Sequence, residues 1–375
     1  MEQTIIRADG EYCKLAPWFA KSRRVMLVCG KSIEKQKIYD YLLNLPKQND
    51  LKIIRFSDFS PNPDYESIVK GVRIFREQKC DAIVAIGGGS SIDVAKCIKL
   101  YSNMDNDGED GLFLKTPVIP NDIPFLAVPT TAGTGSEATR FAVIYYKGNK
   151  QSVADDSCIP DCVLFDGSTL KTLPLYHKKA TMLDAFCHAI ESFWSVNSTD
   201  ESKSYSRKAI QEILKTSEAY LNNTDKGNSR MLEAANLAGR AINITQTTAG
   251  HAMCYKITSL FGCAHGHAAG LCVRVLYKWM TDNLDKCSDK RGQDYLKHTL
   301  DEIGFALGCS DAKFGAAFFS AFFDSLELSV PSATELQFEE LKTSVNPVRL
   351  KNHPIALSEI DIDNLYKRIL KENKS

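Results

Sequence analysis

A nearly unbroken run of apolar residues followed by three glycines limits the possible folds of this chain more than any other feature. The run spans residues 81–86 (DAIVAI), and Gly87, Gly88 and Gly89 follow it directly. A strand that is apolar at every position, not only at alternate ones, is typical of a parallel sheet covered by helices on both faces. Residues 124–129 (PFLAVP) form a second run of this kind. The two runs predict a parallel α/β layer fold for the first part of the chain.

Strand and helix patterns alternate up to about residue 145 and then give way to helical spacing. Further strands are expected at residues 24–30, 51–56, 141–146 and 162–165, and helices at 65–78 and 92–101. After Asp166, helical spacing dominates at residues 178–195, 201–221, 229–244 and 294–307. We therefore expect an α/β dinucleotide-binding domain over residues 1–167 and an all-α metal-binding domain over residues 168–375, with a ligand site in the cleft between them.

Composition narrows the class of protein. The formal net charge is zero, which argues against a general affinity for nucleic acid or for anionic membranes. No apolar run approaches the roughly 20 residues of a membrane span, and the start of the chain lacks a signal-peptide pattern. The 12 cysteines contain no CxxC pair. We interpret them as reduced thiols and expect a cytoplasmic protein.

One carboxylate and three histidines have the residue types of a metal site. Asp184 and His188 stand four residues apart, so a helix over 182–194 would present both on one face. His251 and His265 can complete the set as two further ligands, and such a set suits Fe²⁺ or Zn²⁺. The pair alone is more typical of a solvated helix face, and a lone histidine in an apolar run, such as His251, is more often a hydrogen-bonded core residue.

Two glycine-rich segments follow the buried strands. Residues 87–96 (GGGSSIDVAK) place glycines at the start of a helix, where backbone N–H groups and the helix dipole favour an anion such as a phosphate. We expect these glycines to permit positive φ and close approach of a ligand. Residues 129–137 (PTTAGTGSE) cluster hydroxyls in the same way. A structural turn and a polar surface loop are the alternatives; two such loops after adjacent strands favour one extended ligand, such as a dinucleotide.

Together these motifs resemble the iron-containing (group III) alcohol dehydrogenases, which share their architecture with dehydroquinate synthase and glycerol dehydrogenase. The resemblance rests on GGGSSIDVAK, PTTAGTGSEATR, the DAxxH segment and HGHA, in this order from residue 25 to about 354. It implies a metal site, with iron (Fe²⁺) or alternatively zinc (Zn²⁺), and a site for NADP(H) or NAD(H). The implied metal ligands are Asp184, His188, His251 and His265. The implied cofactor-binding residues are Gly88, Gly89, Ser90, Asp93, Thr130, Thr134, Thr139, Lys150 and Leu170.

The resemblance implies hydride transfer between C4 of the nicotinamide and a small alcohol or aldehyde held at the metal. The metal would act as a Lewis acid on the substrate oxygen. A likeness to phosphonoacetaldehyde reductases around residues 248–256 and HGHA suggests that aldehyde as the specific substrate. The other functions considered are a sugar-phosphate cyclase or lyase of the dehydroquinate synthase type, a polyol dehydrogenase like glycerol dehydrogenase, and a nucleotide-binding protein without activity. A homodimer or higher homo-oligomer is expected.

Two departures from the family pattern bear on the mechanism. Many members have a histidine four residues after the third ligand, where this chain has Tyr255. The proton relay can then run through Tyr255, His267 or water, and His267 has a structural hydrogen bond as its alternative role. Gly30 replaces the aspartate found in NAD-selective members, and Lys31 follows it, which favours NADPH. The cations considered for an anionic substrate are Lys256, Arg274 and Arg140, each with a structural or solvated role as the alternative.

Overall fold

The computed structural model of the protein describes residues 3–8, 10, 12–48, 50–345 and 347–372. The chain divides into two compact units. Unit 1 comprises Met1–Leu173 and Asn222–Asn236, and unit 2 comprises Pro174–Leu221 and Leu237–Ser375. Helix α8 (Asp225–Thr245) therefore starts in unit 1 and ends in unit 2.

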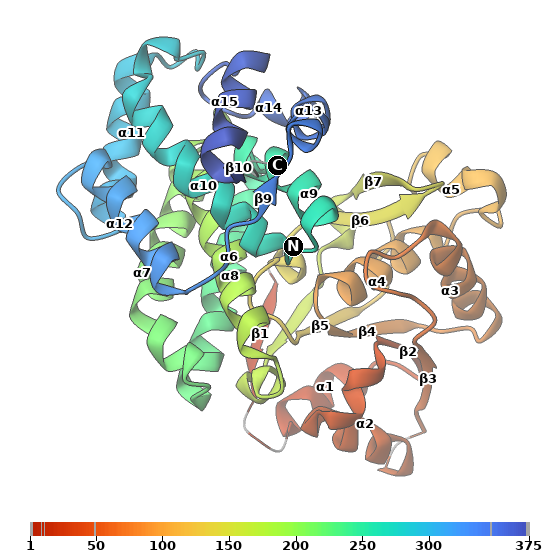
Figure 1. Ribbon diagram of the computed structural model, residues 1–375. Coiled ribbons are helices and arrows are strands. Elements are labelled where there is room, and N and C mark those ends of the chain that lie inside the picture. Colours follow the sequence, from red (N-terminus) through yellow and green to blue (C-terminus); the bar gives the residue numbers. More distant parts are fainter. Residues whose placement is uncertain (1–2, 9, 11, 49, 346, 373–375) are drawn as a thin grey trace. The chain divides into compact units, whose positions relative to one another are not determined.

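A six-stranded, fully parallel sheet forms the centre of unit 1 (Figure 1). Its strands lie in the order β1 (Thr4–Arg7), β8 (Cys162–Phe165), β5 (Phe125–Pro129), β4 (Ala82–Gly87), β2 (Arg24–Cys29) and β3 (Lys52–Phe56). The parallel α/β fold and the five strands expected at these places are confirmed. Strand β1, only four residues long and partly exposed, carries no clear sequence pattern and was not expected.

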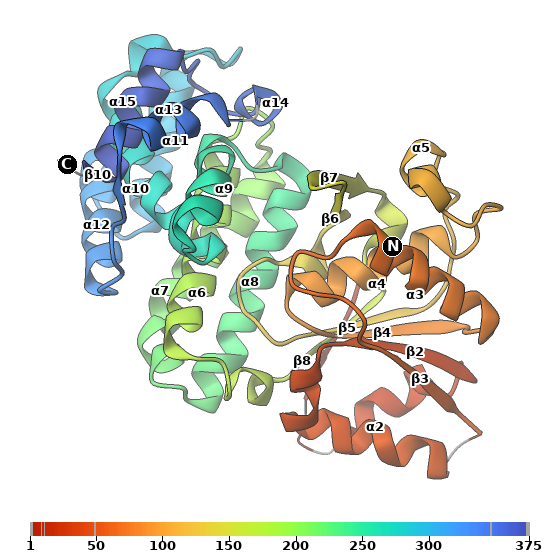
Figure 2. The same ribbon diagram turned by 45° about the vertical axis from the view of Figure 1, so that its right-hand side comes forward.

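Helices cover both faces of this sheet, which explains the unbroken apolar strands. Figure 2 shows α2 (Lys37–Gln48) on one side of the sheet and α3 (Tyr65–Glu77) and α4 (Gly89–Tyr101) on the other. In β4, Ile83 and Ala85 belong to the core shared with α3 and α4, whereas Val84 belongs to the core shared with α2. All three side chains are fully buried. Because successive side chains of a strand point to opposite faces, both sets of positions must be apolar.

A hairpin and several short helices complete unit 1. Residues 141–146 form a strand as expected, β6 (Phe141–Tyr146), but it pairs antiparallel with β7 (Asn149–Ala154) in a separate two-stranded sheet. The connecting residues Lys147 and Gly148 both have positive φ, the conformation of a tight hairpin turn. The short helices include α1 (Ala16–Phe19) and α5 (Leu112–Lys115).

Unit 2 is built of helices, as the spacing of its apolar residues predicts. They are α6 (Leu175–Trp194), α7 (Asp200–Leu221), the end of α8, α9 (Ala249–Phe261), α10 (His265–Asp282), α11 (Gln293–Ala306), α12 (Ala312–Ser325), α13 (Glu335–Thr343), α14 (Pro347–Leu350) and α15 (Glu359–Ile369). One feature was not expected, a parallel pair of two-residue strands, β9 (Ser332–Ala333) and β10 (Lys371–Glu372). Helix α6 packs against α7 and α10 and is buried over almost its whole second half.

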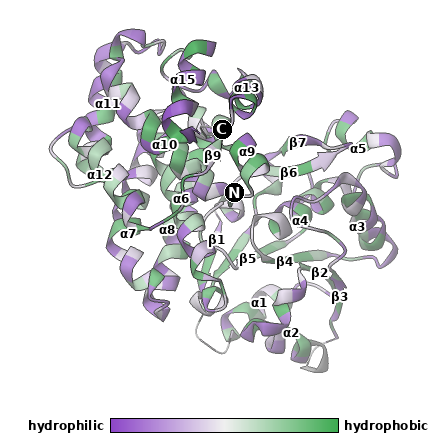
Figure 3. Ribbon diagram, in the orientation of Figure 1, coloured by the Kyte–Doolittle hydropathy of each residue, from purple (hydrophilic) through white to green (hydrophobic). Residues whose placement is uncertain are grey.

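Hydrophobic residues follow this packing. Figure 3 shows them concentrated along α10 in unit 2 and along the central strands in unit 1. Within the described part of the chain, no helix combines the length and apolar character that crossing a bilayer requires.

Candidate functional site

Three helices of unit 2 bring the four predicted metal ligands together. Asp184 and His188 lie one turn apart on α6, and both are buried. His251 lies in the first turn of α9, and His265 is the first residue of α10. His251 is fully buried, whereas the side chain of His265 is 35% exposed, so the cluster opens toward solvent on the His265 side.

The donor atoms of these residues lie at distances that suit a shared cation. One donor atom each of Asp184, His188 and His251 lies within 4.8 Å of the others. Asp184 Oδ1 is 3.5 Å from His251 Nε2 and 3.8 Å from His265 Nε2. Four ligands at about 2.1 Å from a tetrahedral ion are separated by roughly 3.4 Å. The observed separations therefore fit one divalent ion better than direct hydrogen bonds between the side chains.

Two buried polar atoms support this fit independently. Asp184 Oδ1 and His251 Nε2 are both inaccessible to solvent and make no hydrogen bond within the described residues. Leaving such groups unsatisfied costs free energy, about 1–3 kcal/mol for each neutral group and more for a charged one. A cation among these atoms would satisfy both. The residues present therefore fit a resident metal ion.

Glu191 holds His251 in the orientation that ligation requires. The carboxylate is fully buried one turn after His188 on α6. Its Oε2 accepts a hydrogen bond from His251 Nδ1, and its Oε1 accepts from the backbone N–H of His251 at 3.3 Å. Oε1 also accepts from the N–H of Thr248 at 3.0 Å and from its hydroxyl at 2.6 Å. With Nδ1 carrying the proton toward Glu191, Nε2 keeps a lone pair directed at Asp184.

The charges in this cluster depend on one another. Burial alone would raise the pKa of Glu191, but its bonds to His251 and Thr248 lower it to about 2. Burial also acts to raise the pKa of Asp184, and the imidazoles of His188, His251 and His265 outweigh it and lower that pKa. For His251, burial acts to lower the pKa, and the two carboxylates raise it to about 9. Without a metal, a proton on His251 thus balances part of the negative charge.

Two glycines allow the three helices to approach this closely. A Cβ at Gly266 would lie 2.0 Å from the carbonyl oxygen of Ala180 and 2.6 Å from Cβ of Asp184. A Cβ at Gly250 would lie 2.7 Å from Val273 and 3.0 Å from the Glu191 carboxylate. Any side chain at either position would separate the helices that carry the ligands. The glycine between the two histidines of HGHA is therefore a packing requirement of the site.

Tyr255 and His267, the two residues considered for proton transfer, occupy different surroundings. The Tyr255 ring stacks on the His265 ring, with 5.2 Å between centroids. Burial raises the pKa of Tyr255, so its phenol stays protonated at neutral pH. His267 uses both ring nitrogens: Nε2 donates to the carbonyl oxygen of Ser329 at 2.9 Å, and Nδ1 accepts from the Tyr176 hydroxyl at 3.2 Å. These bonds favour the structural role of His267.

The two glycine-rich segments lie side by side in unit 1. Strands β4 and β5 are neighbours, with Gly87 opposite Pro129, so the segments leave the same edge of the sheet. The N–H of Thr130 donates to the carbonyl oxygen of Gly87 at 3.0 Å. A Cβ on Gly89 would lie 3.0 Å from the Thr134 side chain. The expectation of positive φ is wrong for these glycines, which are not among the positive-φ residues. Gly88 and Gly89 are required because the two segments touch, whereas a Cβ on Gly87 would meet the side chain of Ser91 in its own segment.

Other predicted cofactor residues hold these segments in place. Asp93 on α4 accepts from the Ser136 hydroxyl at 2.6 Å and from the N–H of Val143 at 3.0 Å. The positive charge of Lys150 on β7 is close enough to lower the pKa of Asp93, although burial, the larger effect, raises it. The carbonyl oxygen and hydroxyl of Thr139 accept from the buried ammonium of Lys96 at 2.6 and 3.2 Å.

The start of α4 has the features of an anion site. Gly88 is its N-cap and makes no side-chain cap, and Ser90 lies in the first turn.

Leu170 is fully buried beside Thr169, whose hydroxyl donates to the carbonyl oxygen of Pro129 at 2.9 Å. Gly30 follows the end of β2, its carbonyl oxygen is within 3.5 Å of Arg55 Nη2, and Lys31 is exposed.

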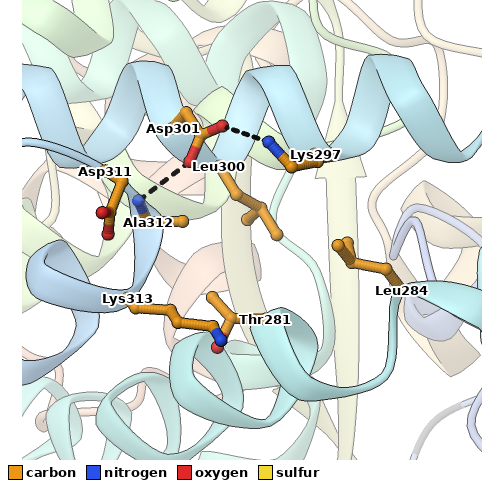
Figure 4. Close-up of a pocket in the computed structure, with 8 residues that line it drawn as sticks. All are labelled: Thr281, Leu284, Lys297, Leu300, Asp301, Asp311, Ala312 and Lys313. Atoms are coloured by element: carbon orange, nitrogen blue, oxygen red, sulfur yellow. Dashed lines mark hydrogen bonds and ion pairs between the residues drawn. The ribbon is translucent and has the colours of Figure 1, made fainter.

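A surface pocket in unit 2 contains none of the predicted site residues (Figure 4). It is lined by residues of α10, α11 and α12 and of the segments that follow α10 and precede α12. Its Asp301 carboxylate already accepts from the N–H of Ala312 at 3.0 Å and from Lys297 at 3.1 Å. Among the described residues, the group of side chains placed to share a metal ion is that of Asp184, His188 and His251, away from this pocket.

Sequence reasoning missed Glu191. It lies seven residues after Asp184 and three after His188, so helical periodicity places it on nearly the same face. That signal was available. The direction of the His251 ring, which makes Glu191 the supporting carboxylate and Asp184 the ligand candidate, has no counterpart in the sequence.

Comparisons with known proteins agree on one family. The family model described as iron-containing alcohol dehydrogenase matches residues 3–167, and that of the C-terminal part of the Fe-containing alcohol dehydrogenase family matches residues 178–368. The aldehyde-alcohol dehydrogenase of Streptococcus pneumoniae is 30% identical over 271 residues. These cover 68% of this chain but only 31% of that relative.

Two further matches carry the names of aldehyde reductases, and the second of them bears on the fold alone. The phosphonoacetaldehyde reductase of Streptomyces viridochromogenes is 30% identical over 259 residues, which cover 66% of each chain. The crystal structure of sulfoacetaldehyde reductase from Bifidobacterium kashiwanohense in complex with NAD⁺ has a TM-score of 0.85 at 24% identity. The superposed region comprises 98% of this chain and 97% of the reductase chain, which establishes the common fold.

Proposed function

Because this chain belongs to the iron-containing alcohol dehydrogenase family, whose members are oxidoreductases acting on CH–OH groups, we propose that it interconverts a small aldehyde and its alcohol with NADP(H) or NAD(H). In the direction of reduction, one aldehyde, one reduced nicotinamide and one proton give one alcohol and one oxidised nicotinamide. The observation that carries the proposal is the convergence of Asp184, His188, His251 and His265 from three helices, with Oδ1 of Asp184 and Nε2 of His251 buried and lacking hydrogen bonds within the described residues.

We assign the four clustered residues as ligands of Fe²⁺, with Zn²⁺ as the alternative that the same donor set accepts. When bound, the metal supplies Lewis acidity to the substrate oxygen, and the nicotinamide supplies or accepts the hydride. Glu191 fixes the tautomer and direction of His251. The partly exposed His265 marks the side from which substrate approaches. Tyr255, protonated and stacked on His265, is the side chain we place nearest to the proton that the reaction moves.

The cofactor is assigned to the paired segments of unit 1. The N–H groups at the uncapped start of α4, around Gly88, Gly89 and Ser90, suit the pyrophosphate. The hydroxyls of Thr130, Thr134 and Thr139 and the side chains of Lys150 and Leu170 complete the proposed cofactor set, and Asp93 positions the second segment. Two features favour NADPH over NADH. Gly30 places no carboxylate that would repel a 2′-phosphate, and the exposed Lys31 carries a positive charge.

The finer proposal is that the substrate is an anionic aldehyde, with phosphonoacetaldehyde as the specific candidate. Its support is the relative from Streptomyces viridochromogenes, whose name gives that activity, at 30% identity.

An anaerobic turnover assay tests the function. The protein is loaded with iron, zinc or manganese, its metal content is measured, and oxidation of NADPH and of NADH is followed with phosphonoacetaldehyde and neutral aldehydes. We expect one mole of nicotinamide oxidised per mole of aldehyde. The variant His265→Ala should lose metal and turnover but keep cofactor binding, whereas His298→Ala, a change at an exposed histidine, should keep all three. If no aldehyde is reduced with any of the three metals, the proposal is wrong.

A further inference from the structure

The cations that the sequence offers for an anionic substrate are already neutralised by neighbouring carboxylates. Arg274 lies 2.8 Å from Asp324, and Lys256 forms an ion pair with Glu340. Arg140, in unit 1, lies 3.3 Å from Asp156. A cation whose charge is balanced by a carboxylate attracts a further anion only weakly. None of the three is therefore the best candidate for binding a negatively charged group.

Arg349, on α14, differs from these residues. Within the part of the chain that the structure describes, its guanidinium donates one hydrogen bond, from Nη1 to the hydroxyl of Thr247 at 2.8 Å, and it lies over the ring of Tyr255 at 5.2 Å from the centroid. The side chain is partly buried. Across the described ranges, no carboxylate forms an ion pair with it. Guanidinium carries five N–H donors in a planar fork, so most of its binding capacity is left for a ligand.

Its position is next to the candidate metal site. Thr247, His251 and Tyr255 follow one another at intervals of four residues, at and beyond the start of α9. Because Arg349 contacts the first and the third, its guanidinium lies along the part of α9 that carries His251. Tyr255, the residue in contact with Arg349, also stacks on His265, the ligand candidate on the open side of the cluster.

We propose that Arg349 binds the negatively charged end of the substrate, and that the substrates are therefore aldehydes with a carboxylate, phosphonate or sulfonate a short carbon chain away from the carbonyl. This proposal rests on the aldehyde reduction proposed above and adds the residue that selects among aldehydes. A partly desolvated guanidinium that no described carboxylate pairs with is stabilised by an anion that accepts two parallel hydrogen bonds. A neutral aldehyde of the same length leaves it unpaired.

The test is a comparison of substrate selectivity between variants of the metal-loaded enzyme. For each protein, kcat/KM is measured with succinic semialdehyde, phosphonoacetaldehyde and the neutral butanal. In Arg349→Gln we expect the ratio of kcat/KM for either anionic aldehyde to that for butanal to fall by about 30-fold or more, mainly through a higher KM. Arg349→Lys should retain part of the ratio, because lysine keeps the charge but not the fork. Arg368→Gln, a matched change on the exposed side of α15, should retain all of it.

The possible results separate this proposal from the one on which it rests. If wild type reduces none of the aldehydes, the proposed function fails. If wild type reduces aldehydes and Arg349→Gln lowers kcat/KM for anionic and neutral substrates by the same factor, Arg349 only supports Tyr255, and the present inference is overturned while the function stands. If Arg349→Gln leaves kcat/KM unchanged for both the anionic and the neutral aldehydes, the present inference is overturned as well. In the reverse direction, the corresponding ratio is kcat/KM for the oxidation of 4-hydroxybutanoate divided by kcat/KM for the oxidation of butanol.

Discussion

Glu191→Gln should weaken metal binding without changing any proposed ligand. The substitution keeps the volume of a fully buried side chain and removes its charge. Glutamine can keep its carbonyl oxygen toward the N–H and hydroxyl of Thr248, but its amide group then faces Nδ1 of His251. An amide N–H makes Nδ1 an acceptor, which moves the imidazole proton to Nε2. That proton would point toward Asp184 Oδ1, which lies 3.5 Å from Nε2, and would occupy the space where the metal is expected.

The size of the effect follows from this choice of tautomer. Either His251 binds the metal only after giving up its hydrogen bond to the substituted glutamine, or the amide turns over and leaves Thr248 without its acceptor. The first route loses one buried hydrogen bond, and the second removes the oxygen that accepts from the N–H and hydroxyl of Thr248 and from the N–H of His251. Loss of such supporting partners typically weakens metal affinity about 10- to 100-fold. This corresponds to about 1.4–2.7 kcal/mol at 25 °C.

Competition with a chromophoric chelator at pH 7.5 measures the zinc affinity of both proteins. Glu335→Gln, the same change at a side chain that is 67% exposed, serves as the control and should bind zinc like wild type. Circular dichroism of the metal-free proteins shows whether Glu191→Gln is folded at the assay temperature. A folded Glu191→Gln variant with zinc affinity within twofold of wild type would refute the supporting role of Glu191.

Three further outcomes follow from the structure. Because a metal must displace the proton from His251, whose pKa is raised to about 9, zinc affinity should rise about tenfold per pH unit between pH 7 and 8.5; chelator competition that gives a flat profile would contradict this. His353 is buried with neither ring nitrogen hydrogen-bonded within the described residues, and burial lowers its pKa to about 4. In the unfolded chain this histidine therefore binds a proton below about pH 6.5, whereas in the folded protein it stays neutral, so the free energy of unfolding falls from pH 6.5 to 4. His353→Phe should flatten this pH dependence in denaturant titrations of the metal-free protein, and parallel pH profiles of wild type and variant would contradict the argument. Gly89→Val should weaken NADPH binding at least about tenfold, because the added side chain meets Thr134 at 3.0 Å, while zinc affinity stays unchanged; unaltered NADPH fluorescence titrations would exclude the assigned role of this loop.

Local patterns were enough to predict much of the fold. The run at 81–86 predicts a strand buried on both faces, because apolar side chains at successive positions need two covered surfaces. The i,i+4 spacing of Asp184 and His188 likewise implies one helix face. By contrast, 141–146 has the pattern of a strand, but its antiparallel pairing with β7 across the Lys147–Gly148 turn, which is a local feature, was not predicted. The spatial order of the six strands in the sheet, β1-β8-β5-β4-β2-β3, brings together segments that are distant in the sequence, and no local pattern predicts it.

The roles of the glycines and of the charged residues also depend on contacts between distant parts of the chain. The sequence predicted positive φ for Gly87, Gly88 and Gly89. The structure instead needs Gly88 and Gly89 because the Thr131–Thr134 segment packs against them, and that contact joins residues about 40 positions apart. The sequence offered Lys256 and Arg274 as cations for a substrate, with a structural role as the alternative, and their ion pairs with Glu340 and Asp324 favour the structural role. Arg349 was overlooked for the opposite reason, since its lack of a carboxylate partner among the described residues is a property of its surroundings.

For this protein, the type of most strands and helices along the chain, the helical second half and the chemistry of the donor set follow from short-range periodicity and residue type. Which carboxylate faces the metal, which one supports His251, and which cation keeps an unbalanced charge depend on side-chain directions and on neighbours far away in the chain. Hydrogen bonds and ion pairs act over a few ångströms in space, so only the packed helices decide them.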